Sequence, residues 1–419
     1  MSTKLIFIII LSVISLILFF VFSSIFRRIS NSKKYRALDK HRKFYKEKIV
    51  SAIQRGSLWQ QSAIFLFRLS PKTIKWQAIE DILLTLIAEE KYKENAKEFF
   101  TKLGYVSFYE KKLKSKNQIK KAAAIDRLGK MLSESSIKKL LEILENEKRN
   151  AEIISITIRA LSRIGPIEGL RGILEQLPDI LGKSLVSRKT IESSLINFGP
   201  AAVPVLIEYG RKYDDPHMRA SILEVLSGLP LTQPSCSFAL ENIKNNEAEV
   251  RAKALMLLGL SNDFSINIDP DLLLPSLNDE VWYVRLQAVK AFSKLKHEKA
   301  IGILGNLLLD TNWQVRNAAS RALAGMEDAS LDVFLKILKS EDRYARESVC
   351  EEIERTNLAK RLIENLDSHD QKICDESKEI LSLMHSLNFS TPLLEFVKKE
   401  REDTLKEKIH MILNEAKTA

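Results

Sequence analysis

The sequence is poor in the residues that build disulfide, metal and cofactor sites. It holds three cysteines and six histidines among 419 residues. Cys236, Cys350 and Cys374 are far apart and have no Cys-x-x-Cys spacing, and no two histidines stand as His-x-x-x-His. Neither a disulfide framework nor a zinc site is therefore predicted. Glycine-rich phosphate loops and Gly-x-Ser-x-Gly are also missing. We expect no catalytic residue, no cofactor and no enzyme activity.

Charge is missing from one long stretch near the start of the chain. Leu5 to Phe26 is a run of 22 residues without a charged side chain. As a helix it would be about 33 Å long, which spans the ~30 Å hydrocarbon core of a bilayer. A cleavable signal peptide has a shorter apolar region, of about 7–15 residues, followed by small residues. Here Arg27 and Arg28 follow bulky side chains, so residues 1–26 are predicted to be an uncleaved transmembrane anchor.

Residues 27–48 form a basic segment directly after this apolar run. They carry a local charge of +8, against +11 for the whole chain. By the positive-inside rule this segment stays in the cytoplasm, which places the N-terminus outside and the rest of the chain inside. Such a segment also attracts anionic lipid headgroups. A nucleic-acid-binding arm is the alternative. The candidate membrane-surface residues are Arg27, Arg28, Lys33, Lys34, Arg36, Lys40, Arg42 and Lys43.

A repeat is visible in the second half of the sequence. Asp279-Glu-Val-Trp-Tyr-Val-Arg285 returns 31 residues later as Asp310-Thr-Asn-Trp-Gln-Val-Arg316. Apolar residues stand at −1, +3, +7 and +10 from each arginine, which is one face of an α-helix. A second apolar helix precedes each arginine helix. A helix pair of this kind cannot bury its apolar face alone, so neighbouring pairs must stack. The same arginine position recurs at steps of 30 to 34, in Arg188, Arg219, Arg251 and Arg346.

These units resemble the HEAT family, and in particular the short bacterial form called the PBS-lyase HEAT-like repeat. In that family an apolar first helix leads through an acidic turn to a Val-Arg-x-x-Ala second helix that ends near glycine. The stretch from Val203 through Arg219 to Gly228 fits this pattern, as do the units at Arg285 and Arg316. The resemblance implies an all-α fold, an α-solenoid of stacked antiparallel helix pairs. It specifies architecture and hardly any function.

The sequence therefore predicts four segments and about eight to ten helix pairs. After the anchor (1–26) and the basic segment (27–48) comes an irregular helical region, 49–118, crowded with aromatic residues. It is predicted to cap the solenoid, with a dedicated ligand pocket as the alternative. The solenoid itself is 119–419. Within it we expect a longer loop at 262–271, and Pro275 should kink its helix or delay its start.

The recurrent acid–arginine pairs have two possible roles. Asp279 with Arg285 and Asp310 with Arg316 could be read as active-site pairs, but an active site is needed once and a packing device in every unit. We expect these acids to cap helix N-termini and to bridge neighbouring repeats. Residues five positions after each arginine alternate in charge, which argues against a phosphate-tracking surface and against nucleic acid as a partner.

Two tryptophans stand off the apolar stripe. Trp282 and Trp313 lie three residues before their arginines, on the side of the helix away from the predicted core. Tyr283 and Lys290 are close by in sequence. Exposed aromatic residues often anchor protein interfaces. The alternative is that each indole packs across the neighbouring turn and seals it.

These features favour a scaffold over an enzyme. We expect a single-pass protein of the cell (inner) membrane whose cytoplasmic solenoid binds a partner protein, as an adaptor or accessory subunit of a membrane or envelope enzyme. Two alternatives remain. One is an enzyme on this scaffold, such as a bilin-lyase-like protein; the other is a nucleic-acid-binding solenoid.

Overall fold

The structure is a computed structural model that describes residues 3–54, 70–147, 149–260, 268–399 and 403–415. Throughout these residues the regular elements are helices, which confirms the predicted all-α solenoid. The chain forms two compact units, Met1–Phe198 and Gly199–Ala419. The aromatic residues at 59, 65 and 67, and most of the predicted loop 262–271, lie outside the described residues.

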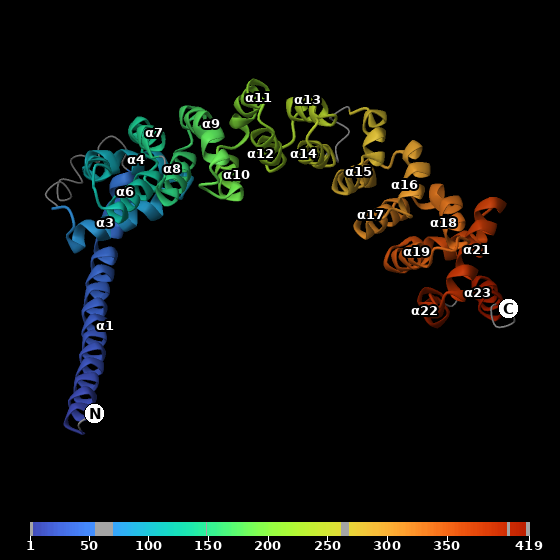
Figure 1. Ribbon diagram of the computed structural model, residues 1–419, viewed down its shortest axis with the longest axis horizontal. Helices are drawn as coiled ribbons and strands as arrows, with labels where there is room; N and C mark the ends of the chain where they lie inside the picture. Colours follow the sequence, from blue (N-terminus) through green and yellow to red (C-terminus); the bar gives the residue numbers. More distant parts are fainter. Residues whose placement is uncertain (1–2, 55–69, 148, 261–267, 400–402, 416–419) are drawn as a thin grey trace. The chain divides into compact units, whose positions relative to one another are not determined.

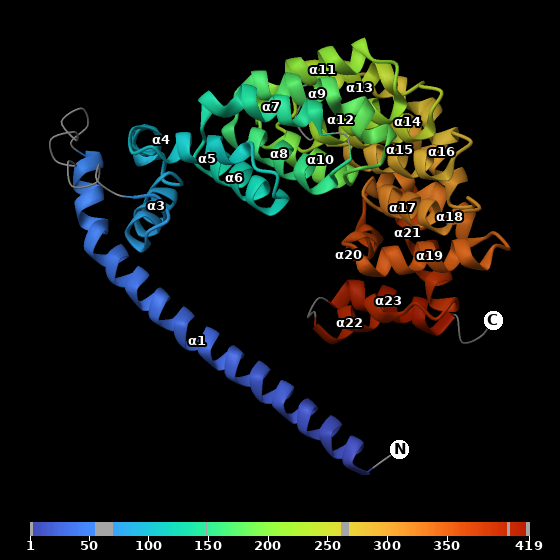
Figure 2. The ribbon, with the colours of Figure 1, turned by 60° about the vertical axis from the view of Figure 1, so that its left-hand side comes forward.

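The first helix, α1 (Thr3–Gln54), is one uninterrupted helix of 52 residues (Figure 2). From Leu11 to Ile29 its apolar side chains are exposed. From Leu38 onward, buried side chains recur at helical spacing and pack against α3 (Ile74–Leu86). The same helix therefore has an apolar part open to its surroundings and a part built into the first unit. The buried side chains are Leu38, Tyr45, Ile49, Ala52 and Ile53.

The beginning of the first unit is held together by aromatic side chains. The rings of Trp76 and Tyr105 lie 3.9 Å apart, and the Tyr105 hydroxyl donates to the Trp76 carbonyl at 2.8 Å. Glu80, 3% exposed, accepts a 2.8 Å hydrogen bond from the Tyr109 hydroxyl and lies 3.5 Å from Arg127. Burial raises the pKa of Glu80 despite these partners. The further helices of this unit are α4 (Lys93–Lys102), α5 (Tyr105–Leu113), α6 (Gln118–Lys130), α7 (Ile137–Asn146), α8 (Ala151–Ile164), α9 (Ile167–Gly182) and α10 (Arg188–Ile196).

The second unit begins with five helix pairs. In Figure 1 the second helices of these pairs follow one another along one side and the first helices along the other. The pairs are α11 (Val203–Lys212) with α12 (Pro216–Ser227), α13 (Gln233–Asn242) with α14 (Ala248–Leu258), η6 (Pro270–Asn278) with α15 (Trp282–Leu295), α16 (Ile301–Leu307) with α17 (Trp313–Ala324), and α18 (Leu331–Leu338) with α19 (Arg343–Arg355). The unit closes with α20 (Leu358–Glu364), α21 (Gln371–Ser386), α22 (Thr391–Lys399) and α23 (Asp403–Glu415).

The predicted apolar register is confirmed in these second helices. Val284, Ala288 and Phe292 of α15 are fully buried, as are their counterparts in α17 and α19. One first helix differs from the others. Where Pro275 was expected to kink or delay a helix, the nine residues Pro270–Asn278 form a 3₁₀-helix. Proline lacks an N–H group and its ring clashes with the carbonyl four residues earlier, which disfavours a continuous α-helix here.

Candidate functional site

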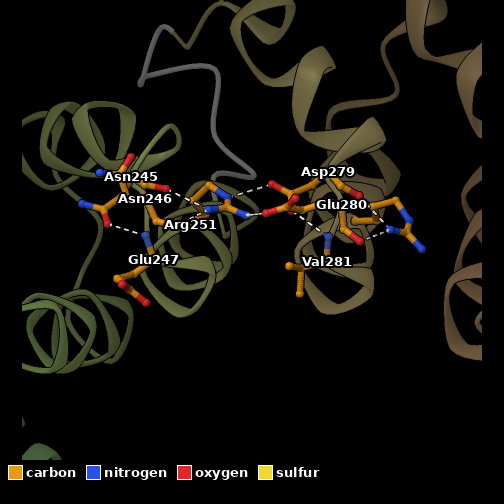
Figure 3. A network of polar contacts seen from close by, with 8 residues as sticks. Asn245, Asn246, Glu247, Arg251, Asp279, Glu280 and Val281 are labelled. Carbon is orange, nitrogen blue, oxygen red and sulfur yellow. Dashed lines mark hydrogen bonds and ion pairs between the residues drawn. The ribbon is translucent and has the colours of Figure 1, made fainter.

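A ladder of arginine and aspartate side chains joins three consecutive repeats of the second unit. Arg251 donates to both carboxylate oxygens of Asp279 at 2.7 and 2.9 Å (Figure 3). Arg285 holds Asp310 in the same two-pronged way, also at 2.7 and 2.9 Å. Each arginine thus reaches the aspartate of the next repeat. The prediction that these residues bridge neighbouring repeats is confirmed.

The arginines also tie down their own turns. Nη1 of Arg285 donates to the main-chain oxygen of Asp279 at 2.7 Å, and Nη1 of Arg316 donates to that of Asp310 at 2.8 Å. Each ladder residue therefore fixes one turn locally and one neighbour at a distance. Of the motif's two acid–arginine pairs, Asp279, Arg285 and Asp310 are engaged within the ladder, and Arg316 donates to main-chain oxygens of its own turn.

The prediction that Asp279 and Asp310 are the N-cap residues of the second helices is wrong. The N-cap residues are Val281 and Asn312, two residues after Asp279 and Asp310. Each aspartate instead accepts from the backbone N–H of the N-cap residue, at 2.9 Å for Asp279 and 2.8 Å for Asp310. The aspartates therefore order the turn that leads into the helix.

The ladder keeps its two aspartates ionised. Partial burial opposes ionisation of Asp279, but hydrogen bonds from Arg251 and from a backbone N–H outweigh it and lower the pKa. The pKa of Asp310 is lowered in the same way by Arg285 and the Asn312 N–H. The ladder therefore consists of ion pairs at neutral pH, with little net charge to offer a partner.

The ladder ends where the aspartate is missing from the sequence. The position of Asp279 is taken by Asn245 one repeat earlier and by Ser340 two repeats later. Arg219 accordingly bonds within its own repeat, to the Gly210 carbonyl at 3.3 Å. Arg316, which by the same pattern would reach position 340, donates among the described residues to the main-chain oxygens of its own turn, Asp310 at 2.8 Å and Thr311 at 3.4 Å. The arginine position recurs more widely than the ladder does.

The predicted interface tryptophans lie at the surface, at the start of second helices. Trp282 is 39% exposed and is the first residue of α15; Trp313 is 61% exposed and is the first residue of α17. Tyr283 is half-buried, with its ring edge-on to Trp282 and the ring centres 5.7 Å apart. Lys290 is exposed two turns further along α15. The structure thus brings Trp282 and Tyr283 into contact and leaves Trp313 standing free of them on the next helix.

A third aromatic residue belongs to this set and was not predicted. Tyr344 is 71% exposed and is the second residue of α19, the next helix in the stack. It was missed because it stands two residues before Arg346, where the tryptophans stand three residues before theirs. The spacing of 31 residues from 282 to 313 and again to 344 is the signal that would have found it. We call Trp282, Trp313 and Tyr344 the aromatic row.

The basic residues predicted to face lipid are solvent-exposed, with one exception. Arg27, Arg28, Lys33, Lys34, Arg36, Lys40 and Lys43 are exposed on α1. Arg42 is half-buried and donates to Asp81 of α3 at 2.6 Å and to Asp39 at 3.0 Å. These contacts raise its pKa, the hydrogen bond to Asp81 most of all. Arg42 therefore fastens α1 to the first unit.

A pocket with a mixed polar and apolar lining lies at the end of the second unit. It has a volume of about 580 Å³ and is bounded by α19, α20 and α22, with Glu351, Lys360 and Phe396 in its wall. Arg355 at its edge is held by Glu352 at 2.8 Å, and Glu354 accepts from the backbone N–H of Thr391 at 3.2 Å. No group of three or more histidine, cysteine, aspartate or glutamate side chains suited to a metal ion occurs among the described residues.

Part of the second unit matches a known family of repeats. Residues 270–367 match the model of the HEAT repeats. No curated protein matches the chain in sequence. The narrower resemblance to the PBS-lyase form remains a prediction.

Comparison with solved structures gives three matches at low identity. One is an engineered protein, with 16% identity, 85% of this chain and 98% of that chain covered, and a TM-score of 0.35. Another is a mutant of Kap121p, which is 14% identical and gives a TM-score of 0.46. The match covers 84% of this chain and 48% of that chain, so this chain spans about half the length of the Kap121p mutant. The third is a structure concerning the interaction between cadherin and beta-catenin. It is 12% identical in sequence, the match covers 86% of this chain and 92% of that chain, and the TM-score is 0.39. The stretch that matches the HEAT-repeat model includes the arginine–aspartate rung from Arg285 to Asp310 and the aromatic row.

Proposed function

We propose that this chain is a membrane-tethered scaffold that holds a partner protein near the cytoplasmic face of a membrane. One observation carries the proposal: α1 is a single helix whose first part exposes an apolar surface and whose last part is packed into the solenoid. A helix built this way joins a membrane to a folded body without a flexible linker. HEAT-type solenoids supply extended surfaces for binding other macromolecules.

The apolar part of α1 has the properties of a membrane span. An 18-residue window within Leu11–Gln54 has a mean hydropathy of 1.8, and none of it is buried. Phe19, Phe20 and Phe22 are each more than 60% exposed. In water, this much exposed apolar surface is unfavourable by about 25 cal/mol per Å², whereas a bilayer core accommodates it. A core helix of a soluble protein would bury the same side chains.

The basic residues of α1 support an orientation with the solenoid in the cytoplasm. The first five, from Arg27 to Arg36, lie within about 15 Å of the end of the apolar run along the helix axis. They are therefore the ones proposed to contact anionic headgroups. The headgroup region extends about 5–8 Å beyond the hydrocarbon core. Lys40 and Lys43, about 21–26 Å from the end of the apolar run, lie beyond it by more than the ~8 Å Debye length at physiological salt if the helix stands upright, whereas the first five do not. Lys40 and Lys43 therefore help to keep this segment on the cytoplasmic side, and they contribute less to headgroup contact.

The second unit offers the proposed partner-binding surface. Its ladder aspartates are paired internally, and the aromatic row is exposed at its surface. Exposed aromatic residues are favoured anchors of protein interfaces. An accessory subunit of a membrane or envelope enzyme is the kind of protein this arrangement suits. Neither the lyase-like nor the nucleic-acid-binding alternative is favoured by a specific feature of the described residues.

The proposal is tested by separating anchoring from folding. The double variant Leu16→Lys/Phe20→Lys places two charges in the apolar part of α1, each of which is unfavourable by about 2.5–3.5 kcal/mol at the centre of a membrane helix. The full-length variant should leave the membrane fraction, and affinity purification of the chain from solubilised membranes should no longer recover the partner. Ile119→Lys is the matched control, because Ile119 is 80% exposed in the first unit. Wild-type membranes without any specific co-purifying protein would contradict the scaffold.

A further inference from the structure

A third arginine continues the ladder without an aspartate to hold. Arg251 holds Asp279 through its Nε and Nη2 atoms (Figure 3). Arg285 holds Asp310 through the same two atoms. Arg316 stands at the same position of the next repeat, and its Nε and Nη2 atoms have no acceptor among the described residues. One positive charge therefore remains beyond the two ion pairs.

Arg316 is nevertheless bound to its own turn in the same way as the paired arginines. Its Nη1 atom donates to the main-chain oxygens of Asp310 at 2.8 Å and Thr311 at 3.4 Å. Nη1 of Arg285 makes the corresponding two bonds to its own turn, at 2.7 and 3.1 Å. The guanidinium group is planar and rigid. With Nη1 on the turn, the edge formed by Nε and Nη2 therefore faces the next repeat, as it does in Arg285.

Ser340 occupies the place of the missing aspartate. The backbone N–H groups of Asp279, Asp310 and Ser340 each donate to the carbonyl three residues earlier. In all three turns the N-cap residue of the second helix follows two residues later. The turns are thus alike, and the side chain differs. The Ser340 hydroxyl donates to the Ile337 carbonyl at 2.7 Å, within its own turn, and offers no carboxylate to the arginine.

The acids that follow Ser340 in sequence do not replace it. Asp342 is the N-cap of α19 and accepts from a backbone N–H of that helix at 2.9 Å. Glu341 is exposed and forms no ion pair within the described part of the chain. Its counterpart Glu280 lies 3.9 Å from Arg251, which keeps Asp279 as its two-pronged partner. An acid at this neighbouring position is therefore compatible with a carboxylate on the arginine.

The unpaired edge of Arg316 is open to solvent beside the aromatic row. Among the described residues, Nε of Arg346 is the buried side-chain nitrogen that lacks a hydrogen-bond partner, so Nε and Nη2 of Arg316 are not buried. Trp313 lies one helical turn before Arg316 and is 61% exposed. Tyr344, 71% exposed, stands at the start of α19, which packs against α17. Another protein that lies on these rings can therefore reach the arginine.

We propose that Arg316 binds a carboxylate of the partner protein, from an aspartate or glutamate side chain, beside Ser340. This inference rests on the proposed scaffold function and names the chemistry of the contact. The carboxylate takes the place that Asp310 has against Arg285, with one oxygen on Nε and the other on Nη2. The arginine fork matches a carboxylate in this two-pronged way and has no acceptor for a cation.

A side chain of the partner fits this position better than a free anion. An ion pair that stays open to water changes affinity by about fivefold at most. In the rung from Arg285 to Asp310 the two side chains are shielded, at 14% and 5% exposure. A partner that covers Trp313 and Tyr344 would shield the new pair in the same way, which strengthens it. The acidic residue recognised best is therefore flanked by apolar residues.

The first test fills the position from within the chain. Ser340→Asp places a carboxylate where the preceding repeat has Asp310, and it should raise the melting temperature of the full-length protein in detergent micelles by about 2–4 °C. Ser340→Asn has nearly the same shape without the charge and should not raise it. The gain should vanish when Arg316→Gln is added. Equal melting temperatures for the Asp and Asn variants would show that Arg316 does not face this position and would overturn the proposal.

The second test measures binding of a fluorescent peptide to the same full-length protein by anisotropy. The peptide has one glutamate between leucines, with serine and glycine elsewhere, and comparison peptides have glutamine or lysine in place of the glutamate. The glutamate peptide should bind about threefold to tenfold more tightly than the glutamine peptide, and the lysine peptide most weakly. Glutamate and glutamine peptides of equal affinity would contradict the proposal.

Variants connect this preference to the arginine. Arg316→Gln and Ser340→Asp should each remove the preference for glutamate over glutamine, whereas Ser340→Asn should keep it. Arg343→Gln is the matched control, because it removes a neighbouring arginine that already donates to Glu347 at 2.7 Å, and it should also keep the preference. A preference that survives Arg316→Gln, or that is lost equally in Arg343→Gln, would place the contact elsewhere and overturn the inference.

Three further results separate this inference from the scaffold itself and from other anions. If the partner is still recovered from solubilised membranes with Ser340→Asp, the scaffold function stands and this contact is not part of it. Inorganic phosphate should compete with the glutamate peptide no better than chloride does at equal ionic strength; stronger competition would indicate a general anion site and overturn the assignment to a carboxylate. A phosphate group on Ser340, found by mass spectrometry of the chain from membranes, would fill the position internally and also overturn it.

Discussion

Arg285 binds both carboxylate oxygens of Asp310 at 2.7 and 2.9 Å, across the boundary between two repeats. Both side chains are largely shielded from solvent, at 14% and 5% exposure. A buried pair of this kind is costly to break, because the remaining charge is left without a partner. The rung from Arg285 to Asp310 is therefore expected to matter more for stability than the ion pairs at the surface.

The first prediction compares this rung with an exposed pair of similar geometry. Asp310→Ala should lower the stability of the second unit by about 2–4 kcal/mol, because Arg285 loses its partner in a shielded site. Arg211→Ala removes a pair with Glu241 that is about half exposed, and it should change stability by less than about 1 kcal/mol. Denaturant midpoints of the full chain, followed by circular dichroism, measure both. Equal shifts for the two variants would show that the ladder adds nothing.

The second prediction concerns acid pH. The pKa values of Asp279 and Asp310 are lowered in the folded chain, so their contribution to stability is complete above the unfolded aspartate pKa of about 3.9. It is lost as the pH falls from there through the lower folded values. The stability of the double variant Asp279→Asn/Asp310→Asn should therefore fall less steeply than that of the wild type below about pH 4. Parallel pH profiles for the two proteins would contradict this assignment.

The third prediction concerns a close approach between two helices of the first unit. A Cβ atom added to Gly129 of α6 would lie 2.7 Å from Cα of Ala160 in α8, which is too close for an ordinary contact. Gly129→Ala should therefore destabilise the first unit by about 1–3 kcal/mol. Gly302 of α16 has open space at the same position, so Gly302→Ala should be neutral or stabilising by up to about 1 kcal/mol. The melting temperature of Gly129→Ala should fall and that of Gly302→Ala should not; a harmless Gly129→Ala would place the helices further apart.

The fourth prediction separates the two roles considered for the tryptophans. Trp313 is 61% exposed, so Trp313→Ala should change stability by no more than about 0.5 kcal/mol. Trp282 packs against Tyr283, so Trp282→Ala should lower stability by about 1 kcal/mol. Phe292→Ala, in the core of the same helix as Trp282, should cost about 3–5 kcal/mol. If the tryptophan variants are as damaging as Phe292→Ala, the indoles seal turns and the row is architectural.

Much of the second unit followed from the sequence because its contacts are local and periodic. The stripe through Val284, Ala288 and Phe292 is fixed by helical spacing, and the structure buries all three. Bridging between repeats was expected because the motif recurs in register, but the motif paired Asp310 with Arg316, and the structure pairs it with Arg285 of the preceding repeat. Tyr344 was missed because its repeat shifts the aromatic residue by one position relative to the arginine.

The contacts in the first unit required the structure. The Trp76–Tyr105 stack and the Arg42–Asp81 pair join residues far apart in a region without a clear repeat. Composition suggested a boundary between an anchor and a basic segment, but hydrophobicity and charge change along α1 while the helix continues. A helix can continue through both parts because apolar and basic side chains are each compatible with its backbone hydrogen bonds.

The account depends most on the orientation of α1 in a membrane. The most direct measurement is labelling of single introduced cysteines in intact cells with a membrane-impermeant thiol reagent, in a background with the three native cysteines replaced by alanine or serine. Thr3→Cys lies before the apolar part of α1, and Asn317→Cys is exposed in the second unit. The account predicts that Thr3→Cys is labelled in intact cells and Asn317→Cys only after lysis. Labelling of Asn317→Cys from outside, or release of the chain into the soluble fraction, would contradict a cytoplasmic scaffold held at the membrane by α1.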